Sequence, residues 1–415
     1  MPKQLPVRSC PSCKGWRVKK NGVTSAGTPR YRCLDCGACH TRHRPQARAG
    51  NTYEAFVSYL LGKHAQSELN RGSDRSVRRN FTWCWNPLVP TPPVSGEVFD
   101  QVFIDGTYLS GGWVVLIACT TTNVLNWQVC AKETKAAYQA LLAPIAPPLM
   151  VVTDGAKGAE RAINSLWPTT KIQRCLVHVH RNNITDLTRK PKTSAGQDLM
   201  CLSRQLTRIT TTTQAANWLA SLAAFYNQYD QYLKQRTFAK DLPQALRKPG
   251  RKWWYTHERD RRVYFRLQRL ARKDQLFAYL TNPTPAHNTT NVVESHNAAI
   301  KQILRNHRGW KPNQQVQAAT HYLNTQTENP FTPRHILKRW QQAGKPHLQL
   351  IPTTTRHTNP PPKHLNQQAP WEDGLSIRKG GLKDKKSWWR VSPSCFGGGL
   401  CGGGRARRWR RPIWG

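Results

Sequence analysis

The most ordered stretch of hydrophobic positions in this chain is Val102–Leu109. It is an apolar, β-branched and aromatic run that carries one carboxylate, Asp105, and breaks at Gly106. Such a run predicts a buried strand. Charges are rarely buried in strands unless they are paired or bind metal. Asp105 is therefore either a metal ligand or the start of a turn, and this run alone leaves both readings open.

The segments that follow alternate between strand and helix patterns. Asp154, which precedes Gly155, ends the fourth apolar run as Asp105 does in the first. The patterns predict strands over 113–119, 126–131, 149–154 and near 172–179, with helices over 135–142 and 159–166. Three adjacent strands followed by alternating helix and strand predict an α/β, RNase H-like mixed sheet. In that order the first and fourth strands are neighbours, so Asp105 and Asp154 would meet.

Residues 180–285 lose strand signals and show helical periodicity, which predicts an all-α insertion. Apolar positions recur every three or four residues at Leu199, Leu202, Leu206, Ile209, Trp218, Leu222, Phe225, Tyr229 and Tyr232. We interpret these stripes as core. The cations and aromatics of Arg251–Tyr255 could stack on an unpaired base, but packed core tryptophans are the favoured interpretation.

A second helical pattern precedes the first strand. Residues 52–80 resemble a helix-turn-helix whose second helix is capped by Ser73 and buries Val77 and Phe81. Three arginines would then face a DNA groove: Arg75, Arg78 and Arg79. A plain helical hairpin with a solvated arginine face is the alternative. A proline-rich linker, 87–97, ends this region.

Two CxxC pairs lie near the beginning of the chain, at Cys10/Cys13 and Cys33/Cys36. Tetrahedral zinc needs four soft ligands, and two turns that each present two thiolates supply them. The spacing predicts a structural zinc ribbon. The nearby Cys39 and His40 are interpreted as non-ligands. Basic and aromatic residues between the pairs suit phosphate contact, although such ribbons also dock proteins.

Composition then identifies the class of partner. The 415 residues contain 63 Lys+Arg and 22 Asp+Glu, a formal net charge of +41. That excess favours a polyanion, most simply nucleic acid. No run of 18 apolar residues occurs, and residues 1–10 contain no apolar core of a signal peptide. Cysteines in metal-like pairs and apolar segments indicate a reducing cytosol.

The third candidate acid is Glu294, in a helix predicted over 291–301. Lys301 follows it by two helical turns, on the same face as Asn297. An ordinary surface helix is the alternative. Two strand-end aspartates and a helix glutamate are what phosphodiester chemistry needs, because carboxylates can hold two hard cations such as Mg²⁺ or Mn²⁺.

The sequence resembles bacterial insertion-sequence DDE transposases of the Mutator-like superfamily. The resemblance lies in Phe103–Tyr108, Val152–Gly155, Arg174–His178 with Arg181-Asn182, and Thr290–Lys301. The Cys-x2-His signature of that family matches Cys175 and His178, for which we expect an auxiliary packing or hydrogen-bonding role. The resemblance covers residues 98–340.

The resemblance implies a function and a domain plan. Asp105, Asp154 and Glu294 would hold the metal pair, and Lys301 would steer the DNA backbone. Water would cut at the element end, and the freed 3′-hydroxyl would attack another phosphodiester. The partners would be terminal inverted repeats, target DNA and further copies of the chain, in a bacterial, nucleoid-associated cytoplasmic protein. The plan is a zinc ribbon (1–50), a helix-turn-helix (51–86), a linker (87–97), a catalytic domain (98–340) and a disordered basic tail (341–415).

Two alternatives remain at this point. The first is a zinc-ribbon and helix-turn-helix regulator whose catalytic fold no longer acts. The retained acids and Lys301 argue against it, since an inactive site has no physical reason to keep them. The second is a nuclease of the same fold, which cuts DNA without joining strands, and nothing in the sequence separates it from a transposase.

Overall fold

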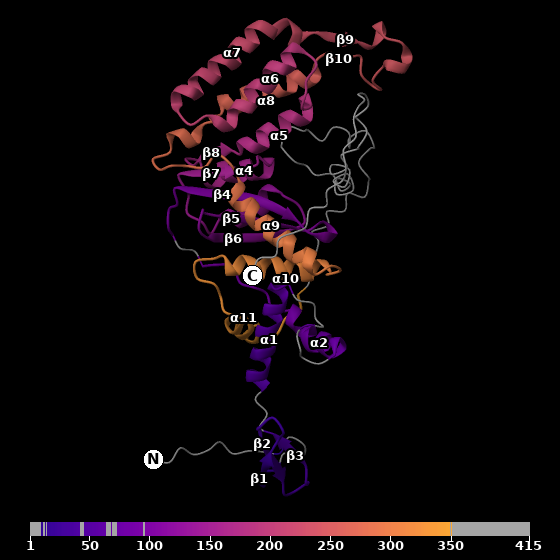
Figure 1. Ribbon diagram of the computed structural model, residues 1–415, viewed down its shortest axis with the longest axis vertical. Helices are drawn as coiled ribbons and strands as arrows, with labels where there is room; N and C mark the ends of the chain where they lie inside the picture. The colour runs from indigo at the N-terminus through magenta and orange to yellow at the C-terminus, as the bar shows by residue number, and fades with distance from the viewer. Residues whose placement is uncertain are drawn as a thin grey trace, which may run out of the picture.

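The computed structural model describes residues 10, 13, 15–41, 45–63, 68, 73–93, 96–348 and 350. Figure 1 shows a helical layer, a central sheet, a further set of helices and a small sheet in succession along the long axis. The predicted tail beyond 350 and most of the predicted helix-turn-helix turn lie outside the described residues. None of the described helices is long and apolar enough to cross a membrane.

The central sheet has five strands in the order β6-β5-β4-β7-β8. The strands are β4 (Gln101–Tyr108), β5 (Val114–Cys119), β6 (Val124–Cys130), β7 (Met150–Thr153) and β8 (Lys171–Arg174). β4 pairs antiparallel with β5 and parallel with β7. The predicted adjacency of the first and fourth strands is therefore confirmed, and the fold is mixed α/β.

Alternation along β4 assigns the two faces of the sheet. Val102 and Ile104 pack with the helices α3 (Lys135–Leu142) and α4 (Lys157–Leu166). Phe103 faces the opposite core, which includes residues of α9 (Asn291–Asn306), α10 (Pro312–Thr325) and α11 (Pro333–Gln342). Successive side chains of a strand point to opposite faces. β4 is thus buried from both sides, as its continuous apolar run predicts.

The N-terminal helices share the second of these cores. α1 (Pro45–Leu61) contacts α10 and α11, and α2 (Asp74–Phe81) contacts α1. Tyr53 of α1 lies with its hydroxyl 3.1 Å from Nε2 of His321 in α10. The small sheet before them consists of β1 (Val18–Val23), β2 (Pro29–Cys33) and β3 (Cys39–Thr41). α1 and α2 are therefore built onto the central domain.

The helical layer confirms the predicted stripes and corrects the prediction of an all-α insertion. Its helices are α5 (Leu176–Leu187), α6 (Ser194–Gln205), α7 (Thr212–Lys234) and α8 (Glu258–Arg272). Leu199, Leu222 and Phe225 are buried in its core. A hairpin of β9 (Arg236–Phe238) and β10 (Trp253–Tyr255) also lies here. Aromatic residues favour extended backbone. Strands of three residues are too short to show an alternation of apolar and polar positions, so the sequence did not predict this hairpin.

Two further expectations are wrong. Trp253 is 39% exposed, and the tryptophan-rich segment lies outside the core clusters of the described residues, because cations stack on its rings instead. The fifth strand ends at Arg174, and α5 begins at Leu176. A short apolar run fits a buried strand or a buried helix equally well by its periodicity. Packing of Leu176 and Val179 in the helical core selects the helix.

Candidate active site

The first two acids meet where β4 and β7 run side by side. Ile104 pairs with Thr153 in the parallel register, which brings the next residues, Asp105 and Asp154, to the same level of the sheet. Oδ1 of Asp154 accepts the backbone N–H of Ala156 at 3.0 Å. Gly155 has a φ of +96°, and a Cβ there would lie 1.7 Å from Arg174, whose guanidinium donates to the Asp154 carbonyl. Only glycine fits this turn.

α9 contributes the third acid and a direct contact to the first. Nδ2 of Asn297 donates to Oδ2 of Asp105 at 2.7 Å, across the interface of α9 and β4. Glu294 lies one turn earlier, in the first turn of the helix, and is half-buried. Lys301 is exposed, and its position two turns beyond Glu294 places it about 10.5 Å along the helix axis. The structure thus brings Asp105, Asp154 and the face carrying Glu294 into one region.

Cys175 and His178 lie beside Glu294. Nδ1 of His178 is 3.7 Å from Oε1 of Glu294, and the Thr290 hydroxyl lies 3.0 Å from that same carboxylate oxygen. The backbone N–H of Thr290 donates to Sγ of Cys175 at 3.3 Å. These contacts link the start of α5 to the start of α9. His178 therefore lies at ion-pair distance from the acid, whereas Cys175 is connected to it through Thr290.

The two side chains influence each other's ionisation. Burial alone lowers the pKa of His178, but its interactions with Cys175, Asp154 and Glu294 outweigh burial and raise it. Burial likewise acts to raise the pKa of Cys175, but hydrogen bonding and attraction to His178 bring it below its ordinary value. Both shifts act in the direction that strengthens attraction between the two side chains, and His178 lies next to the Glu294 carboxylate.

Sequence reasoning missed a further acid, Glu133. It follows β6 and precedes α3, and its Oε2 accepts a hydrogen bond from the Tyr138 hydroxyl at 3.2 Å. Burial first, and then the negative charge of Asp154, raise its pKa. A single glutamate between Lys132 and Thr134 has the sequence pattern of a surface turn. Only its position after a predicted strand could have drawn attention to it.

The concentration of negative charge is strongest at Asp105. Burial, followed by repulsion from Asp154, raises the pKa of Asp105 to about 8, although the backbone N–H of Gly106 and His178 act to lower it. Within the described residues, Asp105, Asp154 and Glu133 form no ion pair with lysine or arginine. Oδ1 of Asn297 is also buried without a hydrogen-bond partner. Oxygen donors lacking a cation are what a hard divalent ion binds.

Two groups of described side chains bring possible ligand atoms within 4.8 Å of one another: Cys10, Cys13, Cys33 and Cys36, and Cys175, His178 and Glu294. Asp105 and Asp154 lie outside the second group. A site for two ions distributes its ligands over two positions, so it does not require all three acids within that distance.

The four cysteines of the small sheet form the compact first group. Sγ atoms of Cys10 and Cys36 are 3.7 Å apart, and those of Cys13 and Cys33 are 3.6 Å apart. This cluster is compatible with a zinc ribbon, since four thiolates in a compact set suit tetrahedral zinc. Cys39 and His40 lie in β3 outside the cluster, in agreement with their interpretation as non-ligands.

The arginines of the expected DNA-reading helix are exposed. Arg75, Arg78 and Arg79 lie on α2, while Val77 and Phe81 are buried. Ser73 is the N-cap, and its side chain accepts the backbone N–H of Ser76. The predicted cap and buried face are confirmed.

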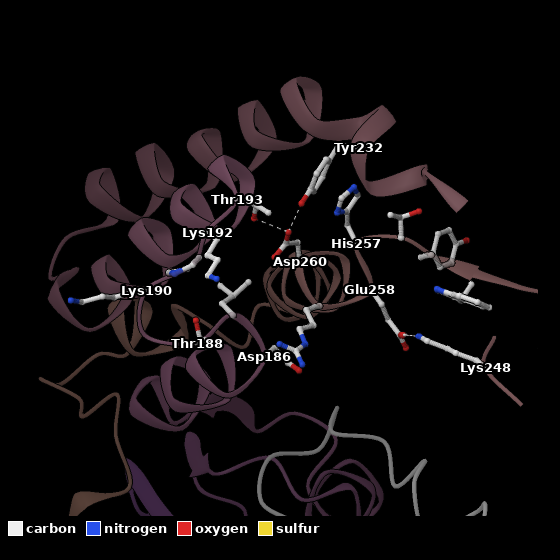
Figure 2. Close-up of a pocket in the computed structure, with 16 residues that line it drawn as sticks. Asp186, Thr188, Lys190, Lys192, Thr193, Tyr232, Lys248, His257, Glu258 and Asp260 are labelled. Carbon is white, nitrogen blue, oxygen red and sulfur yellow. Dashed lines mark hydrogen bonds and ion pairs between the residues drawn. The ribbon is translucent and has the colours of Figure 1, made fainter. Parts of the chain in front are cut away.

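A separate pocket of about 480 Å³ lies in the helical layer. Figure 2 shows acidic side chains lining it that already have donors: Tyr232 and Thr193 point to Asp260, and Lys248 reaches Glu258. A third acid, Asp186, binds the guanidinium groups of Arg262 and Arg266 at 2.8 and 2.5 Å. Asp186 and Glu258 are therefore paired with cations within the protein, and Asp260 is satisfied by two hydroxyl donors.

Comparison with known proteins agrees with the resemblance seen in the sequence. Residues 120–245 match the family described as "Transposase, Mutator family". The chain is also 35% identical, over 149 residues, to the transposase for insertion sequence element IS905 of Lactococcus lactis subsp. lactis (strain IL1403). That alignment covers 32% of this chain and 34% of the relative. The chain therefore spans about a third of the length of the transposase that it matches. The family match includes Asp154, Cys175 and His178. The resemblance to Mutator-family insertion-sequence transposases is confirmed.

Proposed function

We propose, from the likeness to Mutator-family transposases, that this chain is a DNA transposase that binds terminal inverted repeats and performs metal-dependent strand cleavage and strand transfer. The observation that carries the proposal is the pairing of β4 with β7, which puts Asp105 beside Asp154 with no lysine or arginine ion pair to either in the described part of the chain. We also assign the central domain to the RNase H-like class, supported by the β6-β5-β4-β7-β8 order.

In this proposal Asp105, Asp154 and Glu294 hold divalent cations, Mg²⁺ or Mn²⁺. Cations bound there activate a nucleophile and stabilise the leaving oxygen of an in-line displacement. Asn297 orients the Asp105 carboxylate through the 2.7 Å hydrogen bond. His178 and Thr290 hold Oε1 of Glu294 and so fix the start of α9 relative to the sheet.

Other parts of the chain would bind the DNA. Arg75, Arg78 and Arg79 are free of carboxylate ion pairs within the described residues and present three cations on one short helix. Lys301 would contact a phosphate near the acids. Zinc bound by Cys10, Cys13, Cys33 and Cys36 would stabilise the small sheet, and less than about half an equivalent of zinc in reduced, folded protein would contradict that part. The partners would be inverted repeats, target DNA and further copies of the chain in the bacterial cytoplasm.

The direct test is an assay of purified protein with Mg²⁺ or Mn²⁺ on DNA carrying the element ends. Asp105→Asn and Glu294→Gln remove one charge each with little change in shape, and we expect cleavage to fall by at least about a hundredfold because oxygen ligands are lost. Glu160→Gln is the matched control, since Glu160 lies outside the acid group in an ion pair with Lys273. Wild-type cleavage by both active-site variants would refute the metal assignment.

The two alternatives give different results in the same assay. A regulator binds the repeats but does not cut them, and a nuclease cuts without producing joined strands. Short inverted repeats and a target duplication flanking the encoding DNA would favour the transposase over both.

A further inference from the structure

The Glu133 carboxylate approaches β4 at Gly106, the residue that follows Asp105. Glu133 lies in the connection between β6 and α3, immediately before Thr134, the N-cap of α3. The Thr134 side chain accepts the backbone N–H of Ala137, so the helix start is fixed without Glu133. The carboxylate is therefore free of the capping role that its sequence position would suggest.

One glycine makes room for the Glu133 side chain and a second makes room for its backbone. A Cβ on Gly106, the residue after Asp105, would lie 2.7 Å from Oε1 of Glu133. A Cβ on Gly158, in the first turn of α4, would lie 2.7 Å from the Glu133 backbone carbonyl oxygen. Both distances are shorter than side chains tolerate. The closeness of Oε1 to β4 thus depends on glycine beside the first aspartate.

The two oxygens of Glu133 differ in their surroundings. Oε2 accepts the Tyr138 hydroxyl at 3.2 Å, and the Tyr108 hydroxyl also interacts with the carboxylate. Oε1 faces Gly106 on β4, next to Asp105. Glu133 has no ion pair with lysine or arginine among the residues described. Burying a third carboxylate against two others without a counter-charge is unfavourable, so a retained proton or a bound cation must compensate, and the cation can replace the proton.

We propose that Glu133 is a fourth carboxylate of the cation site, which binds the divalent ion through Oε1 while Tyr138 holds Oε2. This inference rests on the proposed function, because it assumes that Asp105 and Asp154 hold such an ion. It adds a ligand to Asp105, Asp154 and Glu294. This ligand precedes α3, which packs on one face of the sheet, whereas α9 packs on the other face. A purely structural acceptor for Tyr138 is the competing explanation.

The test measures Mn²⁺ binding to the full chain in its zinc-loaded form, by calorimetry, without DNA. We compare wild type with Glu133→Gln, Glu133→Asp, Asp105→Asn and the control Glu160→Gln. Glutamine keeps an acceptor for Tyr138 but removes the charge, so we expect Mn²⁺ affinity to fall by about tenfold or more. Glu133→Asp keeps the charge and should lose less. Glu160→Gln should bind as wild type does.

The outcomes separate this inference from the proposed function. If Asp105→Asn weakens Mn²⁺ binding and Glu133→Gln does not, Glu133 is only a structural acceptor and the inference fails while the metal site stands. If neither variant changes binding, both the metal site and the inference fail. Thermal unfolding of the zinc-loaded chain without added Mn²⁺ or Mg²⁺ provides the second readout. A ligand role predicts that Glu133→Gln unfolds at or above the wild-type temperature, whereas a structural role predicts a lower temperature.

Discussion

Two acid clusters in this protein have opposite electrostatic designs. In the helical layer, Asp186 accepts hydrogen bonds from two arginines, and Glu258 pairs with Lys248 (Figure 2). In the central sheet, the negative charge of Asp154 adds to burial in raising the pKa values of Asp105 and Glu133, yet none of these three acids pairs with lysine or arginine in the described chain. Acids with internal counter-charges stabilise the fold. Buried acids without them lack internal compensation for their charge, which is the arrangement that the proposed cation site requires.

The largest effect should come from breaking the buried ion pairs of the helical layer. Asp186→Ala leaves Arg266, whose side chain is 4% exposed, without its carboxylate. Removing one partner of a buried pair costs about 3–5 kcal/mol, because the remaining charge is uncompensated. Urea unfolding of the zinc-loaded, Mg²⁺-free chain measures the loss.

Asp198→Ala is the matched control for that experiment. Asp198 is an exposed acid of α6 in the same helical layer, where it accepts the Tyr229 hydroxyl. Its loss should cost no more than about 1.5 kcal/mol. Equal losses for both variants would contradict the structural role assigned to Asp186.

The contribution of Asp105 to stability should depend on pH in the opposite sense to that of an ordinary ion-paired acid. Because the pKa of Asp105 is raised to about 8, the folded protein retains a proton that the unfolded chain loses near pH 4. In metal-free protein its contribution to stability should therefore fall as the pH rises from about 4 to 8. Asp105→Asn should flatten this slope in thermal unfolding.

Metal binding should reverse that dependence. The cation replaces the retained proton, so Mn²⁺ affinity should increase between pH 6 and pH 8. Identical pH profiles of wild type and Asp105→Asn, with and without Mn²⁺, would show that Asp105 does not carry the raised pKa.

The smallest effect is expected at the rim of the pocket. Lys248 and Glu258 form a 3.0 Å ion pair, but their side chains are 43% and 38% exposed. Exposed pairs contribute about 0–1 kcal/mol and weaken in salt. Lys248→Ala should therefore change the free energy of unfolding by less than about 1 kcal/mol at 0.15 M salt. A loss of unfolding free energy as large as that of Asp186→Ala would show that this exposed ion pair stabilises the fold as much as the buried one.

Elements with strong local signals could be predicted from the sequence. The bounds of α3 follow directly from its apolar spacing, and the buried first half of β4 follows from the apolar run that ends at Ile104. The two CxxC pairs predicted a four-cysteine cluster that the structure brings together. By contrast, the segment after Arg174 carries apolar residues that suit a strand or a helix, and only its packing in the helical core selects α5.

The sequence by itself determined that two neighbouring strands carry Asp105 and Asp154 at or near their carboxyl ends. Local periodicity and turn chemistry are sufficient for that. The break predicted at Gly106 is wrong, because β4 continues past Asp105 to Tyr108 and pairs with β5 over that length. Tertiary structure alone decided the hydrogen bond from Asn297 to Asp105, the contact of His178 with Glu294, and the approach of Glu133 to Gly106. Each depends on how segments far apart in the chain pack against β4. No spacing within one segment encodes that packing.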